Sequence, residues 1–350
     1  MRNKLSMQLA LTAKMCGCSI SRYTRSTVVE NPFKSVRRLL RGWKGKLCLL
    51  LVTLLLLLLT FVWCAYYFAP YRLAFDIKVA TFNWTILNKE TCSQQNQPLL
   101  LIIIRSSPDR WDRRKAIRAT WGDPCTYDRL RVHYMFLVGT YAGWNKVTVN
   151  QLLQLEFSLY RDIAQYDYAD GYTRLSLKQI AAFTIAIKYC SNFPFVFMTD
   201  EDFLVHIPNL VSYIETIKTD DYATFIGGYL YNDSSPVRQR LNRYYVPAEV
   251  YPNGTYPWFT AGGATLLATQ LIERLLVELP KLPTRLHLED VTTGIILQKL
   301  QIKPRNIEKI CILWGSCQDI PFEKRIAVHG YETTADLKRD WNKLNLPSTC

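Results

Sequence analysis

The stretch Phe195–Asp202, which reads FVFMTDED, places a run of apolar and β-branched residues directly before three acids. Such a run is typical of a buried β-strand. In open α/β sheets, ligands bind beyond the carboxyl ends of the strands, which is where these acids lie. Asp200 and Asp202, two positions apart where an extended chain turns, can face one hard divalent cation, and such a cation can also hold a diphosphate. The stretch therefore predicts a strand that ends in a metal-binding site.

On both sides of this stretch, apolar strands alternate with helical segments. Pro98–Ile104 and Val132–Val138 are predicted strands, and Val147–Ile163 and Thr173–Tyr189 are predicted helices. This alternation favours an α/β fold with a mostly parallel central sheet flanked by helices. We expect residues 97–350 to form this folded domain, which is long enough for one sizeable core.

Three other segments are candidates for function. Glu289 and Asp290 stand at the start of a predicted helix, where acids often only complement the helix dipole but can also deprotonate an attacking hydroxyl. Arg113–Arg118 carries four cations, which suit either phosphate binding or a solvated helix face. Tyr256–Gly263 combines aromatic rings that can stack on sugars with glycines that allow close backbone approach. An ordinary packed loop is the alternative for this last segment.

The N-terminal part of the chain predicts a membrane anchor. Leu47–Phe68 holds 22 residues without a charge, and at roughly 1.5 Å per residue a helix of this length spans a hydrocarbon core. Basic residues concentrate before it, so the positive-inside rule places the N-terminus in the cytoplasm. We therefore expect a cytoplasmic tail at 1–46, a signal anchor at 47–68 and a stem at 69–96, in a single-pass type II membrane protein.

The charge of the chain lies mostly in that tail. The formal net charge is +14, and residues 1–46 contain eleven Lys and Arg but only one acid, Glu30. A nucleic-acid-binding domain would instead interleave its cations with aromatic residues on a folded surface. We expect a membrane partner and no nucleic-acid partner.

Cysteines and glycosylation signals indicate that the part of the chain after the predicted anchor lies in an oxidising compartment. Six cysteines follow the predicted anchor, which allows three disulfides in any of fifteen pairings: Cys92, Cys125, Cys190, Cys311, Cys317 and Cys350. Acceptor triplets for N-glycosylation begin at Asn83, Asn232 and Asn253. All three lie beyond the anchor, so we predict a glycoprotein whose main domain is lumenal.

The order of these motifs resembles the β-1,3-galactosyltransferase family, which is glycosyltransferase family 31. The similar blocks are Arg113–Trp121, Asp162–Lys178, Asp200–Asp202, Tyr256–Gly263 and Glu289–Gly294, with Cys190, Pro236, Arg238 and His329 in the expected places. The resemblance runs from Leu99 to Leu344. The chain departs from the family pattern at Arg174, Ile185, Met198 and Trp258, which bears on donor and acceptor preference.

The resemblance implies a GT-A type nucleotide-sugar-binding fold, a Mn²⁺ cofactor, a UDP-sugar donor, and inverting transfer of a hexose to the 3-hydroxyl of a glycan acceptor on glycoprotein or glycolipid. It implies that Asp202, Asp200 and His329 serve the metal and that Asp290 is the general base. Arg114, Arg118 and Lys178 would bind the nucleotide and its phosphates, together with Asp200 and Glu201. It also implies residence in the Golgi membrane.

Galactose is the expected hexose, and alternatives remain. The first is a β-1,3-N-acetylhexosaminyltransferase that uses UDP-GlcNAc or UDP-GalNAc on the same fold. The second is a non-catalytic glycan-binding or assembly partner, although such a protein would not need both a metal site and a base. A metal-dependent phosphohydrolase is disfavoured because it would need a richer ligand set than four histidines readily supply. The oligomeric state stays open.

Overall fold

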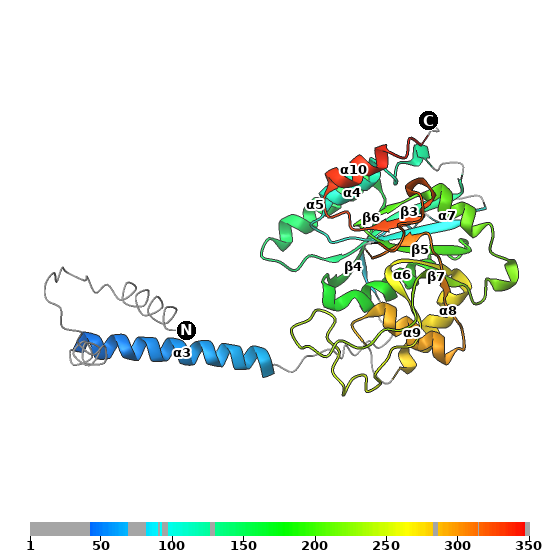
Figure 1. Ribbon diagram of the computed structural model, residues 1–350. Coiled ribbons are helices and arrows are strands. Elements are labelled where there is room, and N and C mark those ends of the chain that lie inside the picture. The colour runs from blue at the N-terminus through cyan, green and yellow to red at the C-terminus, as the bar shows by residue number, and fades with distance from the viewer. Residues whose placement is uncertain are drawn as a thin grey trace. The chain divides into compact units, whose positions relative to one another are not determined.

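The computed structural model describes residues 43–68, 82–89, 92, 97–126, 130–282, 286–313 and 315–346. The chain divides into two compact units, residues 1–72 and 73–350. In the first unit, helix α3 (Trp43–Phe68, blue in Figure 1) contains the predicted anchor. Its segment Lys46–Cys64 has a mean hydropathy of 2.9, and this is the one described helix that is long and apolar enough to cross a membrane.

The second unit is built on an eight-stranded mixed sheet with the order β1-β4-β3-β2-β5-β8-β7-β9. The strands are β1 (Trp84–Ile86), β2 (Leu100–Arg105), β3 (Val132–Thr140), β4 (Ile163–Ala169), β5 (Phe195–Asp200), β7 (Ile226–Tyr231), β8 (Phe259–Ala268) and β9 (Arg305–Asn306). Strands β4, β3, β2 and β5 run parallel. Strand β8 lies between β5 and β7 and is antiparallel to both. Strands β7 and β9 also pair in parallel and run in the same direction as these four, so only β1 and β8 run opposite to their neighbours. The prediction of a mostly parallel sheet is thus confirmed.

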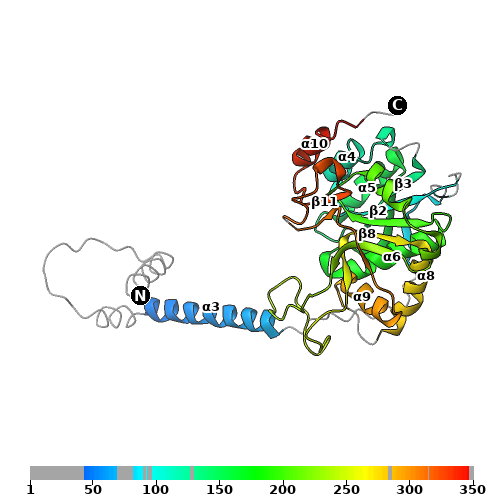
Figure 2. The same cartoon turned by 45° about the vertical axis from the view of Figure 1, so that its right-hand side comes forward.

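Helices cover both faces of this sheet (Figures 1 and 2). One face carries α4 (Trp111–Arg118), α5 (Lys146–Tyr160), α7 (Ile207–Ile214) and α10 (Thr334–Asn342), and the other carries α6 (Leu175–Lys188), α8 (Thr269–Glu278) and α9 (Glu289–Lys299). Alternation along β2 divides the core accordingly. Leu100, Ile102 and Ile104 pack in the first cluster, and Leu101 and Ile103 in the second.

The predicted elements match most of these positions. The strands expected at 98–104 and 132–138 are confirmed as β2 and β3, and the strand expected directly before the acidic motif is confirmed as β5. The helix expected at 147–163 ends earlier, at Tyr160, because Arg161 adopts a left-handed conformation with φ 57°. Strand β4 begins at Ile163, which the prediction had placed at the end of the helix.

A second, three-stranded sheet has the order β10-β11-β6 and was not predicted. It consists of β10 (Ile310–Cys311), β11 (Ala327–His329) and β6 (Phe203–Val205). Strand β6 follows directly after the acidic motif, and its Phe203 pairs with His329 of β11. This pairing brings a residue near the C-terminal end of the chain beside Asp202.

Part of the expected stem belongs to the folded unit. Strand β1 pairs with β4 in antiparallel fashion, and Cys92 forms a disulfide with Cys190. A second disulfide joins Cys311 to Cys317. Disulfides are thereby confirmed as a feature of this unit, which also includes residues before position 97.

Candidate active site

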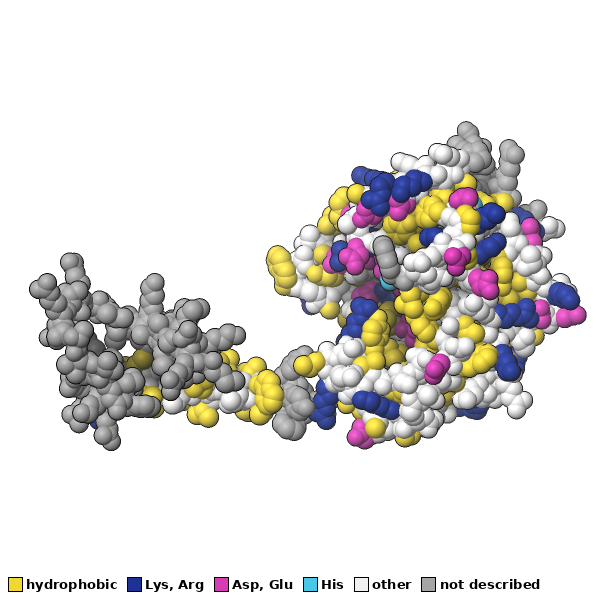
Figure 3. Space-filling view, viewed as in Figure 1, with side chains coloured by type: hydrophobic (Ala, Val, Ile, Leu, Met, Phe, Trp, Pro, Cys, Tyr) yellow, Lys and Arg dark blue, Asp and Glu magenta, His cyan; other side chains and the backbone are white. Residues whose placement is uncertain are grey.

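The acidic motif lies where β5 ends and the chain turns into β6. The parallel pairing of β2 with β5 sets Arg105 directly opposite Asp200, so both strands end in a charged residue at the same edge. Figure 3 shows a hollow on this unit in which acidic side chains, basic side chains and a histidine come together. The predicted position of the acidic motif, at the end of a strand, is therefore confirmed.

Arg105 joins two acidic segments that lie far apart in the sequence. Its Nε and Nη2 donate hydrogen bonds to the two Asp200 oxygens at 2.7 and 3.0 Å, and its Nη1 donates to Glu289 Oε1 at 2.5 Å. A fourth hydrogen bond, from Nη2, reaches the Gly262 carbonyl at 2.9 Å. The guanidinium is almost fully buried, so these contacts fix it firmly. Sequence reasoning missed Arg105, although a charged residue that ends an apolar strand was a usable signal.

The Gly262 backbone approaches this ion pair closely. A Cβ at residue 262 would lie 2.5 Å from Glu289 Oε1, so a larger residue there would displace the carboxylate. This agrees with the expected role of glycines in the 256–263 segment. That segment is not a loop throughout, since Phe259 begins strand β8.

Asp202 and His329 face one another at 3.3 Å between Oδ2 and Nε2. The Nδ1 atom of His329 lies 3.2 Å from the Ile312 carbonyl, which can only accept, so Nδ1 carries the proton and the Nε2 lone pair points toward Asp202 in the neutral ring. The Oδ1 atom of Asp202 is buried and has no hydrogen-bond partner among the described residues. An imidazole nitrogen beside a carboxylate with an unsatisfied buried oxygen fits a divalent cation.

Asp202 and His329 shift each other's pKa. The hydrogen bond from His329 and its charge lower the pKa of Asp202, although burial alone would raise it. The hydrogen bond to Asp202 raises the pKa of His329 against the effect of burial. A cation that binds here would replace the imidazolium proton, so metal binding and the protonation of His329 exclude one another.

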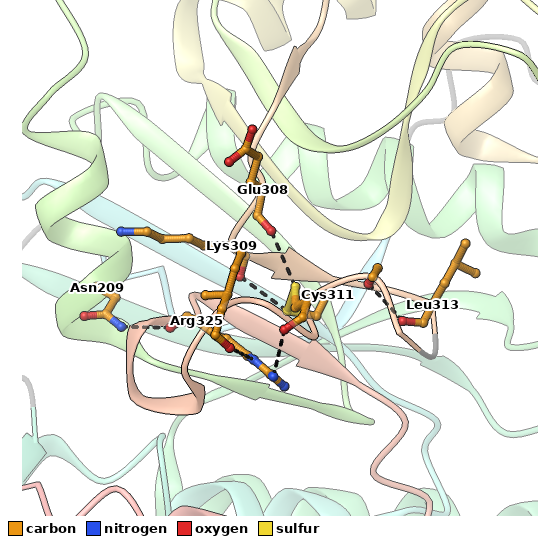
Figure 4. The surroundings of a disulfide bond; sticks show 9 residues. Asn209, Glu308, Lys309, Cys311, Leu313 and Arg325 are labelled. Atoms are coloured by element: carbon orange, nitrogen blue, oxygen red, sulfur yellow. Dashed lines mark hydrogen bonds between the residues drawn. A yellow bond between two sulfur atoms is a disulfide. The ribbon is translucent and has the colours of Figure 1, made fainter.

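Ile312 lies in a short segment that is cross-linked by a disulfide, and Figure 4 shows the surroundings of this disulfide. The Cys311–Cys317 disulfide closes this segment at its start. Arg325, which precedes β11, donates to the carbonyls of Cys317 and Ile320 at 2.9 and 3.0 Å. The disulfide at β10 and the arginine before β11 therefore fix the backbone that leads to His329.

Two side chains, Asp202 and His329, are candidate metal ligands at this point. No group of three or more His, Cys, Asp or Glu side chains in the described part of the chain could hold a metal ion by itself. Asp200, predicted as a metal ligand, accepts hydrogen bonds from Arg105 Nε and Nη2, one on each carboxylate oxygen. A cation held by Asp202 and His329 would need its other ligands from the substrate and water, as sites that hold Mg²⁺ or a similar ion on phosphates do.

Glu201 turns away from that pair and supports the loop after β2. Its Oε2 accepts a hydrogen bond from Ser106 Oγ at 2.5 Å and from the Ser107 backbone N–H at 3.3 Å. Burial raises the pKa of Glu201 to about 7. These contacts fix the loop that follows Arg105, and the role of Glu201 in binding a nucleotide stays a prediction.

Asp290 lies in the first turn of α9, beside Glu289. Its Oδ1 accepts a hydrogen bond from the Val291 backbone N–H at 2.8 Å. Burial raises the pKa of Asp290 to about 7, and the neighbouring Glu289 carboxylate adds to the rise. A carboxylate whose pKa lies near neutral pH is suited to accept a proton from a hydroxyl.

Two cavities meet at the acidic motif. One has a volume of about 540 Å³ and is lined by Lys178 and Glu201. The other has a volume of about 640 Å³ and is lined by Asp290 and His329. Arg105, Asp200 and Asp202 line both cavities. The motif thus stands between two spaces, each large enough for a small-molecule ligand.

Lys178, predicted to bind the nucleotide, lies at the wall of the smaller cavity. Its Nζ donates to Asp170 Oδ2 and to the Ser106 carbonyl, each at 2.8 Å. An ammonium group carries three protons, so one donor remains for a ligand. Its role in binding a nucleotide stays a prediction.

Arg114 and Arg118, predicted to bind phosphates, do not line either cavity. Arg114 is fully buried and donates to Glu156, Ser106 and the carbonyls of two loop residues, which uses all five of its donors. Arg118 donates to Glu156 and Asp162. This prediction is corrected: the acids of α5 and of the turn after it neutralise both arginines, which a sequence alone could not reveal.

We expect Arg114→Lys to destabilise the fold without changing how tightly the donor substrate binds. Lysine cannot reproduce the fork of hydrogen bonds to Glu156 and leaves part of a buried ion pair unsatisfied, which costs about 2–4 kcal/mol. Chemical denaturation would measure the loss. Arg110→Lys is the matched control because Arg110 is exposed and lines the smaller cavity one helical turn away. A large rise in donor KM for Arg114→Lys, with unchanged stability, would contradict this assignment.

The three predicted glycosylation sites are exposed. Asn83 precedes β1, and Asn232 and Asn253 lie between β7 and β8. The Asn83 side chain donates to Asp167 Oδ2 at 3.0 Å, whereas those of Asn232 and Asn253 face solvent. Exposure is required for glycan attachment, and attachment itself stays a prediction.

The chain matches a family model described as Galactosyltransferase over residues 112–308, which is more than half of its length. It is 32% identical over 264 residues to human beta-1,3-galactosyltransferase 1, covering 74% of this chain and 78% of that protein. It is also 32% identical over 232 residues to lactosylceramide 1,3-N-acetyl-beta-D-glucosaminyltransferase of Xenopus tropicalis. This match covers 64% of the chain and spans only 60% of the length of that relative.

Among solved structures, the chain is similar to a glycosyltransferase involved in the glycosylation of the major capsid of PBCV-1. The identity is 13% and the TM-score 0.34, over 70% of this chain and 100% of that one. This likeness is too distant to bear on the site.

Proposed function

The chain belongs to the galactosyltransferase family, and on that premise we propose that it is an inverting β-1,3-glycosyltransferase. In this proposal it moves a hexose from a UDP-sugar to the 3-hydroxyl of a glycan acceptor. One observation carries the proposal. Arg105 links the acidic motif to the Glu289–Asp290 pair by ion pairs at 2.7 and 2.5 Å, so a metal-binding pair and a candidate base share one site between two cavities.

The smaller cavity suits the donor. Lys178 lies on its wall with a spare donor for a phosphate oxygen, and Ser106 and Ser107 bring the loop after β2 to the same space. Asp202 and His329 would hold Mn²⁺, and the bound ion would supply positive charge that neutralises the leaving diphosphate. Asp200, held by Arg105, is then free of the metal and can accept hydrogen bonds from the ribose or the donor sugar. A GT-A type fold is part of this proposal.

The larger cavity suits the acceptor. Asp290 lies on its wall, where a carboxylate with a pKa near 7 can take the proton of the attacking 3-hydroxyl. The hydroxyl would approach from the side opposite the leaving diphosphate, since the acidic motif separates the two cavities. One displacement from that side inverts the anomeric centre.

We propose galactose as the transferred hexose. The family description names galactose, and so does one of the relatives reported above. The other relative is named for N-acetylglucosamine, so an N-acetylhexosaminyl donor is the alternative. We also propose that α3 anchors the enzyme in the Golgi membrane with the second unit in the lumen, because disulfides and exposed acceptor asparagines occur in that unit.

The test is release of UDP by the full-length protein in detergent micelles. We expect turnover of one donor among UDP-Gal, UDP-GlcNAc and UDP-GalNAc, with Mn²⁺ and a β-linked acceptor present. Analysis of the product linkage should show a β1,3 bond. Glycan binding without turnover of any donor would instead favour the non-catalytic carbohydrate-binding alternative.

A further inference from the structure

A third cavity lies beside the larger one. It has a volume of about 520 Å³, and Trp258, Asn232 and Gln298 are on its walls. The segments around residues 232 and 258 are joined by a hydrogen bond from the Tyr256 backbone N–H to the Ser234 carbonyl at 2.8 Å. Tyr256 lines both cavities. The third cavity therefore borders the larger cavity, on whose wall Asp290 lies.

The walls of this cavity combine an aromatic platform with uncommitted polar groups. Trp258 is 44% exposed, so part of its ring surface is open to the cavity. Asn232, Asp233, Gln298 and Gln301 contribute amide and carboxylate groups, and their side chains form no hydrogen bond with any other described residue. Lys303 Nζ lies 5.8 Å from the centre of the Trp258 ring and adds a donor. The apolar indole ring can pack on the C–H face of a pyranose, and the surrounding hydrogen-bond donors and acceptors can bind its hydroxyls. The low net charge of these side chains suits a neutral sugar.

The platform is rigidly placed relative to Asp290. A Cβ at Gly294 would lie 2.9 Å from the Trp258 carbonyl oxygen and 2.7 Å from Phe259 Cβ, so the backbone at these residues packs directly on α9. Gly294 and Gln298 follow Asp290 at successive intervals of four residues, which places all three on one side of the helix. At 1.5 Å per residue, Gln298 lies about 12 Å from Asp290 along the helix axis. A chain of a few linked sugars spans such a distance.

We propose that the cavity walled by Trp258 and Gln298 is a second carbohydrate subsite, which takes a sugar ring of the acceptor beyond the one that receives the transferred hexose. This inference rests on the proposed function, because it assumes that the acceptor is a glycan. The ring would stack on the free face of Trp258, and its hydroxyls would bond to the amides of Asn232 and Gln298. Acceptors that reach this cavity would then bind more tightly than short ones.

The test compares acceptors of increasing length with the Trp258→Ala variant of the full chain. The probes are methyl β-D-galactoside, lactose and the linear tetrasaccharide lacto-N-neotetraose, all of which end in a β-linked galactose. We expect Trp258→Ala to raise KM for the tetrasaccharide about fivefold to tenfold, with kcat unchanged. KM for the methyl glycoside should not change. Trp111→Ala is the matched control, because Trp111 is also exposed and also has a lysine 5.8 Å from its ring, but lies in α4.

Direct binding separates a failure of this inference from a failure of the proposed function. Saturation-transfer NMR on the tetrasaccharide should show contacts at sugars remote from its terminal galactose, and Trp258→Ala should remove them. An equal KM for all three acceptors, in the wild type and in Trp258→Ala alike, would overturn the subsite. No turnover of any acceptor, together with Trp258-dependent binding, would overturn the transferase and keep a carbohydrate site.

A glycan attached to Asn232 itself is the competing occupant, since this asparagine is a predicted glycosylation site on the cavity wall. The measurements are therefore repeated after enzymatic removal of N-glycans. We expect KM to depend on acceptor length in the same way before and after this treatment. If Trp258→Ala lowers only the melting temperature of the glycosylated protein and leaves every KM unchanged, the cavity holds the protein's own glycan and the proposal is wrong.

Discussion

Asp290→Asn should lower kcat by about 10²- to 10⁴-fold, the range that a general base contributes, while the fold is retained. Asparagine keeps the Oδ1 atom that accepts from the Val291 backbone N–H, but it cannot take a proton. Steady-state kinetics with the preferred donor measure the loss. Asp220→Asn is the control, because Asp220 is an exposed acid outside both cavities and should leave kcat unchanged.

The pH dependence gives a second, independent measure of Asp290. Its pKa is about 7 and the base must be ionised, so kcat/KM of the wild type should fall about tenfold per pH unit below 7. The raised pKa also has a cost in stability. Ionised Asp290 disfavours the folded state above the folded pKa, and this cost disappears as the pH falls toward the unfolded value of 3.8.

Asp290→Asn should therefore melt at a higher temperature than the wild type at pH 8, and the difference should shrink toward pH 4. A merely structural carboxylate would show the opposite sign, with a less stable variant at pH 8. Retained turnover in a stable Asp290→Asn protein would exclude Asp290 as the base.

Removal of the proposed metal ligands should have the other large effect. Asp202→Asn and His329→Gln should each weaken Mn²⁺ binding by more than about 100-fold, since even residues that only orient a ligand account for 10- to 100-fold. Isothermal titration calorimetry or Mn²⁺ electron paramagnetic resonance, with UDP present, measures this affinity without turnover. Chelation should likewise remove activity, and added Mn²⁺ should restore it in the wild type only.

Metal binding should also weaken as the pH falls. The Asp202 carboxylate raises the pKa of His329, so the imidazole holds its proton to a higher pH and competes with the ion. Asp319→Asn, an exposed acid near the Cys311–Cys317 loop, is the control. Unchanged Mn²⁺ affinity in both ligand variants would place the metal elsewhere or show that none is required.

The candidate site was predictable where the signal lies within one local segment. The acidic motif follows a recognisable buried strand, and Asp290 stands at a recognisable helix start, so the order of residues is enough to single out both. Lys178, predicted from the family resemblance, lies on a cavity wall. Arg114 and Arg118 of α4 were wrongly predicted to bind phosphates. A basic helix face has the same sequence pattern whether its arginines bind a phosphate or the Glu156 carboxylate.

By itself, the sequence determined the apolar N-terminal helix, the alternation of strands and helices around β2, β3 and β5, and the order of motifs that marks the family. These features depend on periodicity and spacing along the chain. Only the tertiary structure decided which side chains meet. The register of β2 against β5 sets Arg105 on Asp200, and the pairing of β11 with β6 sets His329 on Asp202. Both contacts join residues far apart in the chain, so they follow from packing of the whole unit, and no local pattern encodes them.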